Sequence, residues 1–518
     1  MPDRQNILFV IIDQLRADCL TGALSDHVNL PNLQALRQEA VTFANHHSVC
    51  NPCGPARASI LTAQYAMNHR STRNGTPLTH DTPNLATQLR SAGYLPLLYG
   101  YNDCTRDPRG LDPADPQLTS YEEVMPGFHE VVEMRLETSL PWRSDLAAKG
   151  YDVSDYPDVY RARGDDVTAP ALYSAEDSDT AFLTNAMLRD LSQRDPGWCA
   201  HITYIRPHPP LVAPAPYNTM YDPQALPPPH TNGSREDAQS EHPFHDVSLE
   251  YRKAADFVVG FPDLEDTPEN IAKLRAIYLG LATEVDHHIG RIIQYLKDSG
   301  QYDDTLIVVT ADHGEMLGDH HAWGKMSYHA AANHVPLIIR DPSTPAQHGL
   351  RVDQPTESID VTPTILDLCG AAIPDTMDGQ SLREFLETGA AEDWRDHIFC
   401  ELDFGDPIEP TLFQQRLGMS CDKANLAILR RGSHTLVHFN GGLPALLLET
   451  SPSGATQDLA AQPGAEKAIL ELSQAMLDHR MTFADGRFAH TMVTSQGVKT
   501  TPRHQNLPDR PSRLAKVL

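Results

Sequence analysis

Two hydrophobic patterns alternate along the first three quarters of this sequence. Continuous apolar runs, such as 6–12 and 305–310, are typical of strands that are buried on both faces of a parallel sheet. Between such runs, apolar residues recur at spacings of three and four. The pattern is clearest from Pro268 to Gly300, which predicts a long helix with proline in its first turn and glycine at its end. Strands that alternate with helices predict an α/β domain whose parallel sheet carries helices on both faces.

The same reasoning assigns the other regular elements of this region. Strands are predicted at 95–99, 199–205 and 335–339, and helices at 31–40, 56–63, 85–92, 181–191 and 361–369. The stretches 105–174 and 212–265 lack a clear period, so we expect long loops there.

The pattern changes after about residue 390. Short strands at 397–402, 426–430 and 436–439, followed by one helix at 465–479, are typical of an antiparallel α+β unit. We therefore expect a large domain over residues 1–390 and a smaller C-terminal subdomain over residues 391–518. The end of the chain has no period and is expected to form an arm that packs on a neighbouring subunit.

Composition narrows the classes of partner. The 518 residues include 41 lysines and arginines against 69 aspartates and glutamates, a formal net charge of −28. Such a chain lacks the basic stripes that neutralise phosphates, so nucleic acid is not an expected partner. No apolar run approaches the roughly 20 residues of a membrane span, and the N-terminus lacks a signal-peptide pattern. The eight cysteines are scattered, which favours reduced thiols and a cytoplasmic location.

Polar residues follow the predicted strands of the large domain. Asp13 ends the first strand, Asp312 and His313 end the strand at 305–310, and Asp103 and His208 follow two others. Ligands of open α/β sheets bind beyond the carboxyl ends of the strands, so we expect these residues to converge in one crevice. Asp13, Asp312 and His313 are suitable ligands for one divalent ion.

The segment Cys50-Asn-Pro-Cys53-Gly-Pro55-Ala-Arg57 has three interpretations. As a C-x-x-C pair it would be a redox centre or half of a zinc site, although the chain has no second such pair. As Cys53-x-Pro55-x-Arg57 it matches the core signal for conversion of a cysteine to formylglycine. It would otherwise be an ordinary turn before a helix.

Further motifs accompany this one between about residues 5 and 440. They are Asp13-Gln14, Cys53 to Thr62, Tyr65-Ala-Met-Asn-His-Arg70, Arg206-Pro-His208-Pro-Pro, and Asp312-His313-Gly-Glu-Met-Leu-Gly-Asp-His-His321 through Lys325. On these residues the chain resembles the sulfatase branch of the alkaline phosphatase superfamily, and within it phosphonate monoester hydrolases and the arylsulfatases close to them.

This resemblance implies a fold and an activity. The fold is alkaline phosphatase-like, with a large, mixed, mostly parallel sheet and a smaller C-terminal antiparallel α+β subdomain. The implied activity is the metal-dependent hydrolysis of aryl sulfates, together with hydrolysis of phosphonate monoesters and phosphodiesters. The alternative is an enzyme of the same family that acts primarily on phosphonate monoesters or phosphodiesters. The implied substrate is a small anionic ester, and the implied assembly is a homodimer or homotetramer.

The resemblance also implies a nucleophile. Cys53 is converted to formylglycine by a formylglycine-generating enzyme and hydrated to a gem-diol, one oxygen of which attacks sulfur or phosphorus. Collapse of the resulting hemiacetal then expels sulfate or phosphonate. The implied contacts are Arg57 to the diol, Lys325 to the diol and the transferred group, His208 to the leaving group, and Asn74 and Tyr101 to the anionic group.

The implied metal shell adds Gln14 and the modified Cys53 to Asp13, Asp312 and His313. Many sulfatases have aspartate where this chain has Gln14, and asparagine where it has His313. This softer donor set favours Mn²⁺, with Ca²⁺ or Mg²⁺ also possible. Three further histidines are expected near the site: His320, His321 and His329.

Asp103 departs from the family pattern, because phosphonate monoester hydrolases tend to have threonines after the tyrosine that Tyr101 matches. A carboxylate directed into the site would repel dianions and favour singly charged esters. The side chain could equally point at Arg106. Since the chain is acidic overall, the site must be a local positive pocket, which also argues against polyanionic substrates.

Two other functional hypotheses remain open at this point. One is a two-metal phosphatase or phosphodiesterase of the same fold, with Ser59 or Thr62 as nucleophile and an unmodified Cys53. The other is a non-enzymatic C-x-x-C binding or redox protein, which leaves the motif from Asp312 to Lys325 unexplained.

Overall fold

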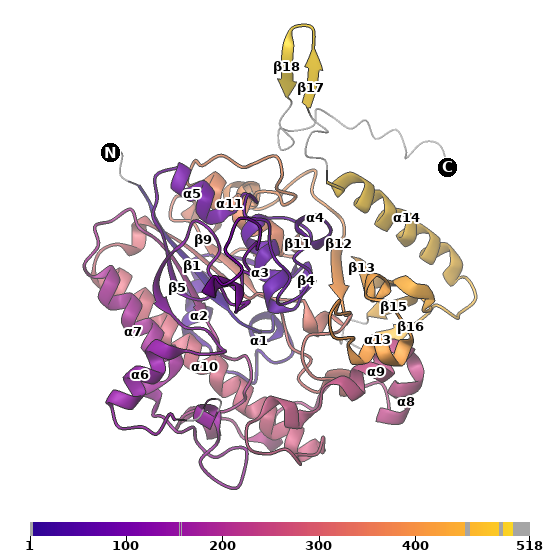
Figure 1. Ribbon diagram of the computed structural model, residues 1–518, viewed down its shortest axis with the longest axis horizontal. Coiled ribbons are helices and arrows are strands. Elements are labelled where there is room, and N and C mark those ends of the chain that lie inside the picture. The colour runs from indigo at the N-terminus through magenta and orange to yellow at the C-terminus, as the bar shows by residue number, and fades with distance from the viewer. Residues whose placement is uncertain (1–3, 155, 157, 451–455, 486–490, 501–518) are drawn as a thin grey trace.

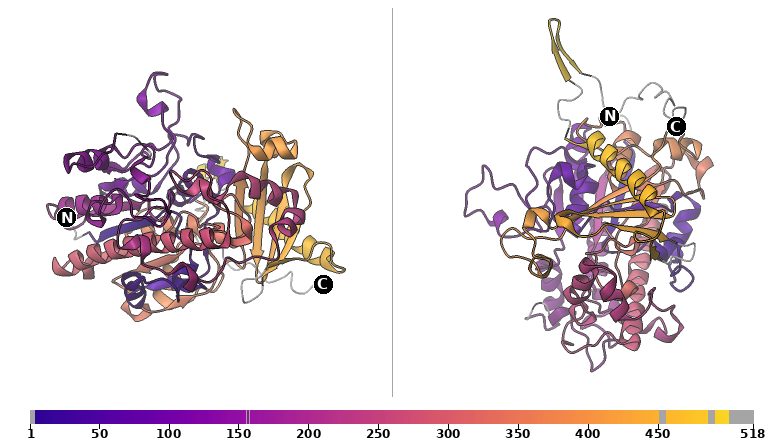
Figure 2. Two further views of the ribbon diagram at one scale, coloured as in Figure 1. Left: turned by 90° about the horizontal axis from the view of Figure 1, so that it is seen from below. Right: turned by 90° about the vertical axis from the view of Figure 1, so that its right-hand side faces the viewer.

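The structure is a computed structural model that describes residues 4–154, 156, 158–450, 456–485 and 491–500. Two large sheets lie side by side (Figures 1 and 2). In the described residues the larger sheet has eight strands, in the order β10 (Arg351–Val352), β2 (Val41–Phe43), β9 (Leu337–Arg340), β8 (Thr305–Thr310), β1 (Asn6–Ile12), β7 (Cys199–Tyr204), β5 (Pro96–Gly100) and β6 (His129–Glu133).

This sheet is mixed but mostly parallel, as expected. β1 pairs in parallel with β7 and β8, and β5 pairs in parallel with β6 and β7. Among the described strands of this sheet, only β9 is antiparallel to its neighbours, which are β8 and β2. The sequence predicts β9 as one more strand of a parallel sheet, so its direction differs from that prediction.

Side chains on β1 alternate between two cores, which explains the continuous apolar run. Leu8, Val10 and Ile12 pack with α2 (Pro31–Gln38), α7 (Asp179–Leu191) and α10 (Pro268–Asp298). Ile7, Phe9 and Ile11 pack on the other face with α3 (Cys53–Thr62), α5 (Leu85–Ser91), α11 (Val361–Leu368) and α12 (Arg383–Thr388). Each face of the sheet is therefore covered by helices, as the pattern of strands and helices predicts.

Two stretches expected to be long loops contain regular structure. The first holds β6 and α6 (Leu140–Ala148), and the second holds α8 (Arg235–Glu241) and α9 (Pro243–Tyr251). Those expectations were wrong for these four elements, although other parts of both stretches are irregular. β6 is a half-exposed edge strand and α8 is a polar helix, so neither has a marked apolar period, and α6 and α9 have only nine residues each. Helix α3 starts three residues earlier than predicted, because Pro55 falls in its first turn, where a missing backbone N–H costs no intrahelical hydrogen bond.

The second sheet lies in the C-terminal region and is largely antiparallel. Its described strands are, in order, β16 (Thr456–Asp458), β15 (Leu446–Thr450), β14 (His434–Phe439), β13 (Asn425–Arg431), β12 (Ile398–Asp403) and β4 (Cys50–Asn51). Helix α14 (Ala465–Phe483) packs on one face, and α9 and α13 (Leu412–Leu417) pack on the other. Because β4 pairs in parallel with β12, this sheet directly supports the turn that leads to Cys53. The domain division at residue 390 stays a prediction.

The C-terminal arm is described only in part. Strands β17 (Thr491–Thr494) and β18 (Gly497–Thr500) form a hairpin that stands away from the body in Figure 1. The rest of the predicted arm, at 486–490 and 501–518, lies outside the described residues. No helix in the described part of the chain is both long and apolar enough to span a bilayer.

Candidate active site

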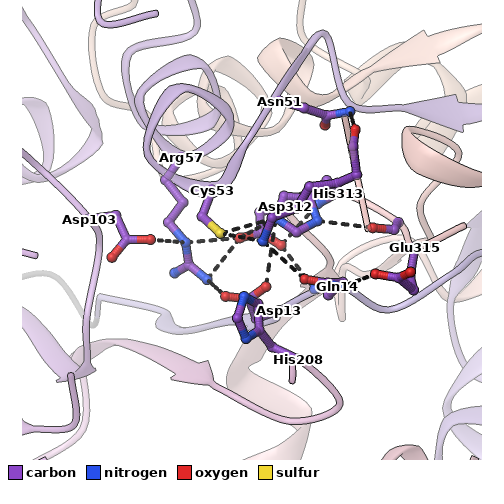
Figure 3. Close-up of polar contacts among 12 residues, drawn as sticks. Asp13, Gln14, Asn51, Cys53, Arg57, Asp103, His208, Asp312, His313 and Glu315 are labelled. Atoms are coloured by element: carbon purple, nitrogen blue, oxygen red, sulfur yellow. Dashed lines mark hydrogen bonds and ion pairs between the residues drawn. The ribbon is translucent and has the colours of Figure 1, made fainter. Parts of the chain in front are cut away.

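The carboxyl ends of four neighbouring strands meet at one edge of the large sheet. In the order β8, β1, β7, β5, these strands are followed by Asp312, Asp13, His208 and Tyr101. Helix α3 brings Cys53 to the same place (Figure 3). The predicted convergence of residues from distant parts of the sequence is therefore confirmed.

Four buried side chains form a cluster suited to a metal ion. One ligand atom from each of Asp13, Cys53, Asp312 and His313 lies within 4.8 Å of all the others. His313 Nε2 lies 3.2 Å from Cys53 Sγ and 3.8 Å from Asp13 Oδ1. His313 Nδ1 donates to the Gly314 carbonyl at 3.1 Å, so the Nε2 lone pair of the neutral ring faces the cluster.

The charge state of these groups also fits a cation. Burial acts to raise the pKa of Asp312, but His313, Arg57 and Lys325 hold it at about 2. Burial lowers the pKa of His313 to about 4. Burial and the charge of Asp312 raise the pKa of Asp13, whose buried Oδ1 has no hydrogen-bond partner among the described residues. A divalent cation would provide a partner for Asp13 Oδ1 and would offset the repulsion between the carboxylates of Asp13 and Asp312.

Arg57, one helical turn after Cys53, is completely buried and holds the carboxylates together. Its guanidinium donates to Asp312 Oδ2 at 3.0 Å from Nε and to Asp13 Oδ2 at 3.1 Å from Nη2. It also donates to the carbonyl and the hydroxyl of Tyr101, at 3.2 and 3.1 Å, and the tyrosine ring packs against it. The Tyr101 hydroxyl in turn donates to Asp13. This network fixes the guanidinium in one orientation.

Asp103 points at Arg57 and not at Arg106. Its Oδ2 lies 3.6 Å from Arg57 Nε (Figure 3), whereas Arg106 donates to the Val124 carbonyl. The carboxyl is buried, its Oδ1 has no partner in the described structure, and burial raises its pKa well above the ordinary value. A third carboxyl group therefore faces the guanidinium, and burial disfavours its ionised form.

Lys325 lies on the open side of the site. Its Nζ donates to Cys53 Sγ at 2.9 Å and to Gln14 Oε1 at 3.0 Å. Its backbone carbonyl accepts a hydrogen bond from Asn51 Nδ2 at 2.9 Å. Because Asn51 belongs to β4, the second sheet helps to place this lysine.

Cys53 is the first residue of α3, where the positive end of the helix favours an anionic group. The next residue is glycine for a steric reason, because a Cβ on Gly54 would lie 2.9 Å from Asn74 Oδ1. That oxygen accepts the Gly54 N–H at 3.0 Å. Asn74 thus holds the start of the helix and also lines the neighbouring cavity.

A cavity of about 380 Å³ opens beside Cys53. Gln14, Asn74, His208 and Lys325, all from or beside the motifs described above, line one side of it. Its other walls come from α9 and the segment after it, α13, and the loops near 323 and 404. They contribute the aromatic side chains Tyr251, Phe257, Trp323, Phe404 and Phe413. The lining also includes the charged residues Arg73, Arg252, Asp256, Asp403 and Asp406, so aromatic rings alternate with charged side chains in this part of the cavity.

His208 reaches the cavity with one nitrogen already engaged. Its Nδ1 donates to the Pro209 carbonyl at 2.6 Å, so Nε2 is the nitrogen available to a ligand. Burial and the charge of Lys325 lower the pKa of His208 well below its usual value.

The hydroxyls of the alternative nucleophiles are engaged elsewhere. Ser59 Oγ hydrogen-bonds His69 and Cys50 at 2.9 and 3.2 Å, and Thr62 donates to the Ala58 carbonyl. His69 Nδ1 accepts the Ser71 N–H, so its Nε2 carries the proton and the ring cannot act as a base toward Ser59.

The two sulfurs of the C-x-x-C pair have different partners. Cys50 Sγ contacts Ser59, whereas Cys53 Sγ contacts His313 and Lys325, and all eight cysteines are free.

The three further histidines expected nearby do not enter the cluster. His320 and His329 stack on each other at 3.6 Å between ring centroids, and His321 hydrogen-bonds the Gly233 carbonyl.

Two residues without a role in the sequence analysis belong to the site. Asn51 holds Lys325 as described above, and Glu315 is buried beneath Gln14, to which it is hydrogen-bonded (Figure 3). The position of Glu315, two residues after His313 in a quoted motif, was the available signal. Its partner could not be read from the sequence, because Gln14 is about 300 positions away.

Comparison with known proteins identifies the class. The sulfatase family model matches residues 5–371, so the chain belongs to the sulfatase family. As in that family, the fold is alkaline phosphatase-like, and the protein is a hydrolase that acts on ester bonds.

Relatives and solved structures refine this placement. The phosphonate monoester hydrolase SpPMH from Silicibacter pomeroyi is 56% identical, with a TM-score of 0.95 over 97% of this chain and 100% of that chain. The phosphonate monoester hydrolase of Agrobacterium radiobacter is 38% identical, with a TM-score of 0.91 over 96% and 100%. The multifunctional alkaline phosphatase superfamily protein PehA of Trinickia caryophylli is 36% identical over 96% of this chain and 99% of its own length. An arylsulfatase of Clostridium perfringens is 26% identical over 78% and 82%.

Proposed function

We propose that the protein hydrolyses singly charged phosphonate monoesters and aryl sulfates, with formylglycine at position 53 as the source of the nucleophile. The observation that carries the proposal is the position of Cys53, which lies at the N-terminus of α3 in contact with His313 and Lys325. The resemblance carried by the sequence motifs implies aryl sulfates as the first class of substrate. The two phosphonate monoester hydrolases that match nearly the whole chain favour phosphonate monoesters as the preferred substrates.

The proposed metal ligands are Asp13, Gln14, the modified Cys53, Asp312 and His313. A divalent ion bound there would supply positive charge to the transferred group and lower the pKa of the attacking hydroxyl. Four buried carboxyl groups, those of Asp13, Asp103, Asp312 and Glu315, face only the two cations of Arg57 and Lys325, and burial leaves the pKa raised in all but Asp312. A divalent cation would favour the ionised forms of the carboxyl groups that bind it. The mixture of carboxylate, amide and imidazole favours Mn²⁺, with Ca²⁺ and Mg²⁺ as alternatives.

The protein's own side chains would position and stabilise the reacting groups. We assign Lys325 to the nucleophile and a non-bridging oxygen of the substrate, since its Nζ already contacts Cys53 Sγ, the atom that the hydrated aldehyde oxygens would replace. Arg57 would hold the carboxylates and the nucleophile in register, with Tyr101 fixing Arg57 and Asp13. Asn74 would bind the anionic group from the cavity side.

His208 is the proposed contact to the leaving group. Because Nδ1 donates to Pro209, only Nε2 can reach the ester oxygen, and it can donate a proton only from the imidazolium form. Burial and Lys325 disfavour that form in the free protein, so a bound anion would have to raise the pKa of His208 for it to act as the proton donor. The aromatic side chains of the cavity would accept the rest of the leaving group, which favours aryl over small alkyl esters.

Maturation and assembly complete the proposal. A formylglycine-generating enzyme would modify Cys53 before use. The exposed apolar side chains of the β17–β18 hairpin, Met492, Val493 and Val498, support an arm that packs on another subunit of a homodimer or homotetramer. The cytoplasmic location expected from the sequence stays a prediction.

A substrate panel tests the function directly. The protein is produced in a host that makes formylglycine and assayed with 4-nitrophenyl phenylphosphonate, 4-nitrophenyl sulfate and 4-nitrophenyl phosphate, with Cys53→Ala as the control. We expect kcat/KM to fall in that order and all three rates to vanish in the control. Phosphate as the best substrate, with activity kept in Cys53→Ala, would overturn the proposal in favour of a phosphatase with another nucleophile.

A further inference from the structure

A buried carboxylate lies directly behind the Gln14 side chain. Glu315, in the loop after β8, is 1% exposed. Its Oε1 accepts the backbone N–H groups of Leu317 at 2.9 Å and Gly324 at 2.6 Å, and its Oε2 accepts the side-chain amide of Gln14 (Figure 3). All three partners are donors, so Glu315 acts purely as an acceptor.

The neighbours of Gln14 determine which end of its amide faces which way. An ammonium group can only donate, and Lys325 Nζ lies 3.0 Å from one amide atom of Gln14, so that atom must be the oxygen. The nitrogen must then face Glu315. The hydrogen bonds on both sides agree on one orientation.

This orientation directs the amide oxygen toward the metal cluster. The Gln14 backbone N–H donates to Asp312 Oδ1 at 3.1 Å, which places residue 14 beside the two carboxylates. Gln14 also has a positive φ of 66°, a conformation that is held by its surroundings rather than by preference. An acid at position 14 would instead face the Glu315 carboxylate inside the protein.

We propose that Glu315 is a positioning residue that presents the Gln14 oxygen to the metal, and that it is the reason this chain has an amide at position 14. The loop holds Glu315 through two backbone donors, and Glu315 holds Gln14 through a third hydrogen bond. Gln14 and Glu315 therefore form one hydrogen-bonded unit with a single negative charge, which Glu315 carries. The inference rests on the metal site of the proposed function.

An exchange of the two side chains tests this coupling. Gln14→Glu and Glu315→Gln are isosteric changes. The double variant moves the negative charge from position 315 to position 14. In metal-free protein we expect each single variant to lower the melting temperature. Gln14→Glu places two carboxylates together. Glu315→Gln keeps an oxygen for the two backbone donors but turns its amide nitrogen toward the amide nitrogen of Gln14, so that hydrogen bond is lost. The double variant should melt above the Gln14→Glu protein, since its carboxylate at 14 again faces an amide.

Metal binding provides a second readout that does not depend on activity. We expect Glu315→Gln to weaken Mn²⁺ binding to the metal-free protein by about 10- to 100-fold in calorimetric titrations, the usual effect of removing a group that orients a ligand. The double variant should bind Ca²⁺ better relative to Mn²⁺ than the wild type does, because a carboxylate is a harder ligand than an amide.

Glu357→Gln is the matched control. Glu357 is also buried, accepts the Phe399 backbone N–H and the Tyr65 hydroxyl, and pairs with Arg395 at 2.9 Å. These partners lie outside the metal cluster and outside the Gln14–Glu315 pair. This variant should melt earlier with unchanged Mn²⁺ affinity.

The possible failures are distinguishable. Strictly additive effects in the double variant, or Mn²⁺ affinity in Glu315→Gln equal to that of the wild type, would overturn the positioning role while leaving the proposed function intact. A wild-type protein that binds neither Mn²⁺ nor Ca²⁺ would overturn the metal site itself, and the coupling of melting temperatures would still decide whether positions 14 and 315 act as one unit.

Discussion

The two cations next to Cys53 are held in different ways. Arg57 is fully buried in α3 and is surrounded by Asp13, Asp312, Asp103 and Tyr101. Lys325 lies on a loop, lines the cavity, and its Nζ contacts Gln14 and Cys53. The protein neutralises one cation to organise its own carboxylates and leaves the other open toward a substrate. The first should therefore govern folding and metal binding, and the second should govern rate.

Replacement of Arg57 should have the largest effect. In Arg57→Ala the buried carboxylates lose their shared partner, at a cost of about 3–5 kcal/mol in the free energy of unfolding, and we expect activity to be lost with it. Differential scanning calorimetry and kcat/KM on the same preparation provide the measurement. Arg57→Lys, which keeps the charge but not the forked geometry, should lie between the two proteins. A wild-type melting temperature in Arg57→Ala would contradict the organising role.

Replacement of Lys325 should separate rate from stability. We expect Lys325→Ala to lower kcat/KM by about 10²- to 10³-fold, because a cation aimed at the transferred oxygens is lost. The melting temperature should stay close to that of the wild type, since few groups of the protein depend on this ammonium. A loss of stability as large as that of Arg57→Ala would show that the two cations do the same work.

His208 should matter most for poor leaving groups. We expect His208→Ala to lower kcat/KM by about 10²-fold for an unsubstituted phenyl ester, and much less for a 4-nitrophenyl ester, whose anion leaves without a proton. A series of substituted phenylphosphonate esters measures this as a steeper dependence of rate on leaving-group pKa. Equal losses across the series would contradict a proton-donor role.

Asp103 should give the smallest effect, on selectivity rather than rate. Removing a carboxylate 3.6 Å from Arg57 adds positive charge to the site, so Asp103→Asn should raise the ratio of phosphate monoester to phosphonate monoester hydrolysis by about 10-fold. Because burial raises the pKa of Asp103, more of the wild type carries the charge as pH rises, and the difference should grow with pH. A ratio that is the same in both proteins at every pH would contradict the role in selectivity.

The strand ends could be predicted from the sequence because a doubly covered sheet needs continuous apolar strands, and the polar residue that stops each run lies at the open edge. Asp13, Asp312 and His208 were found in this way. Cys53 and Lys325 needed the family motifs, since nothing in a local pattern marks a loop lysine.

The supporting residues could not be predicted because their partners are distant in the chain. Glu315 is one acid among many until the fold brings Gln14 to it, and Asn51 gains its role only when β4 pairs with β12. The sequence left open whether Asp103 points into the site or at Arg106, and the answer likewise depended on the packing of the segment after β5. Hydrogen bonds between distant segments carry no signal in hydrophobic periodicity.

The chemical state of residue 53 is the most direct test of the proposed formylglycine nucleophile. Protein made in a host that forms formylglycine is digested, and the peptide containing residue 53 is analysed by mass spectrometry alongside kcat with 4-nitrophenyl phenylphosphonate. We expect an aldehyde or its hydrate at position 53, with kcat proportional to the modified fraction across preparations. An intact thiol in fully active protein would contradict it.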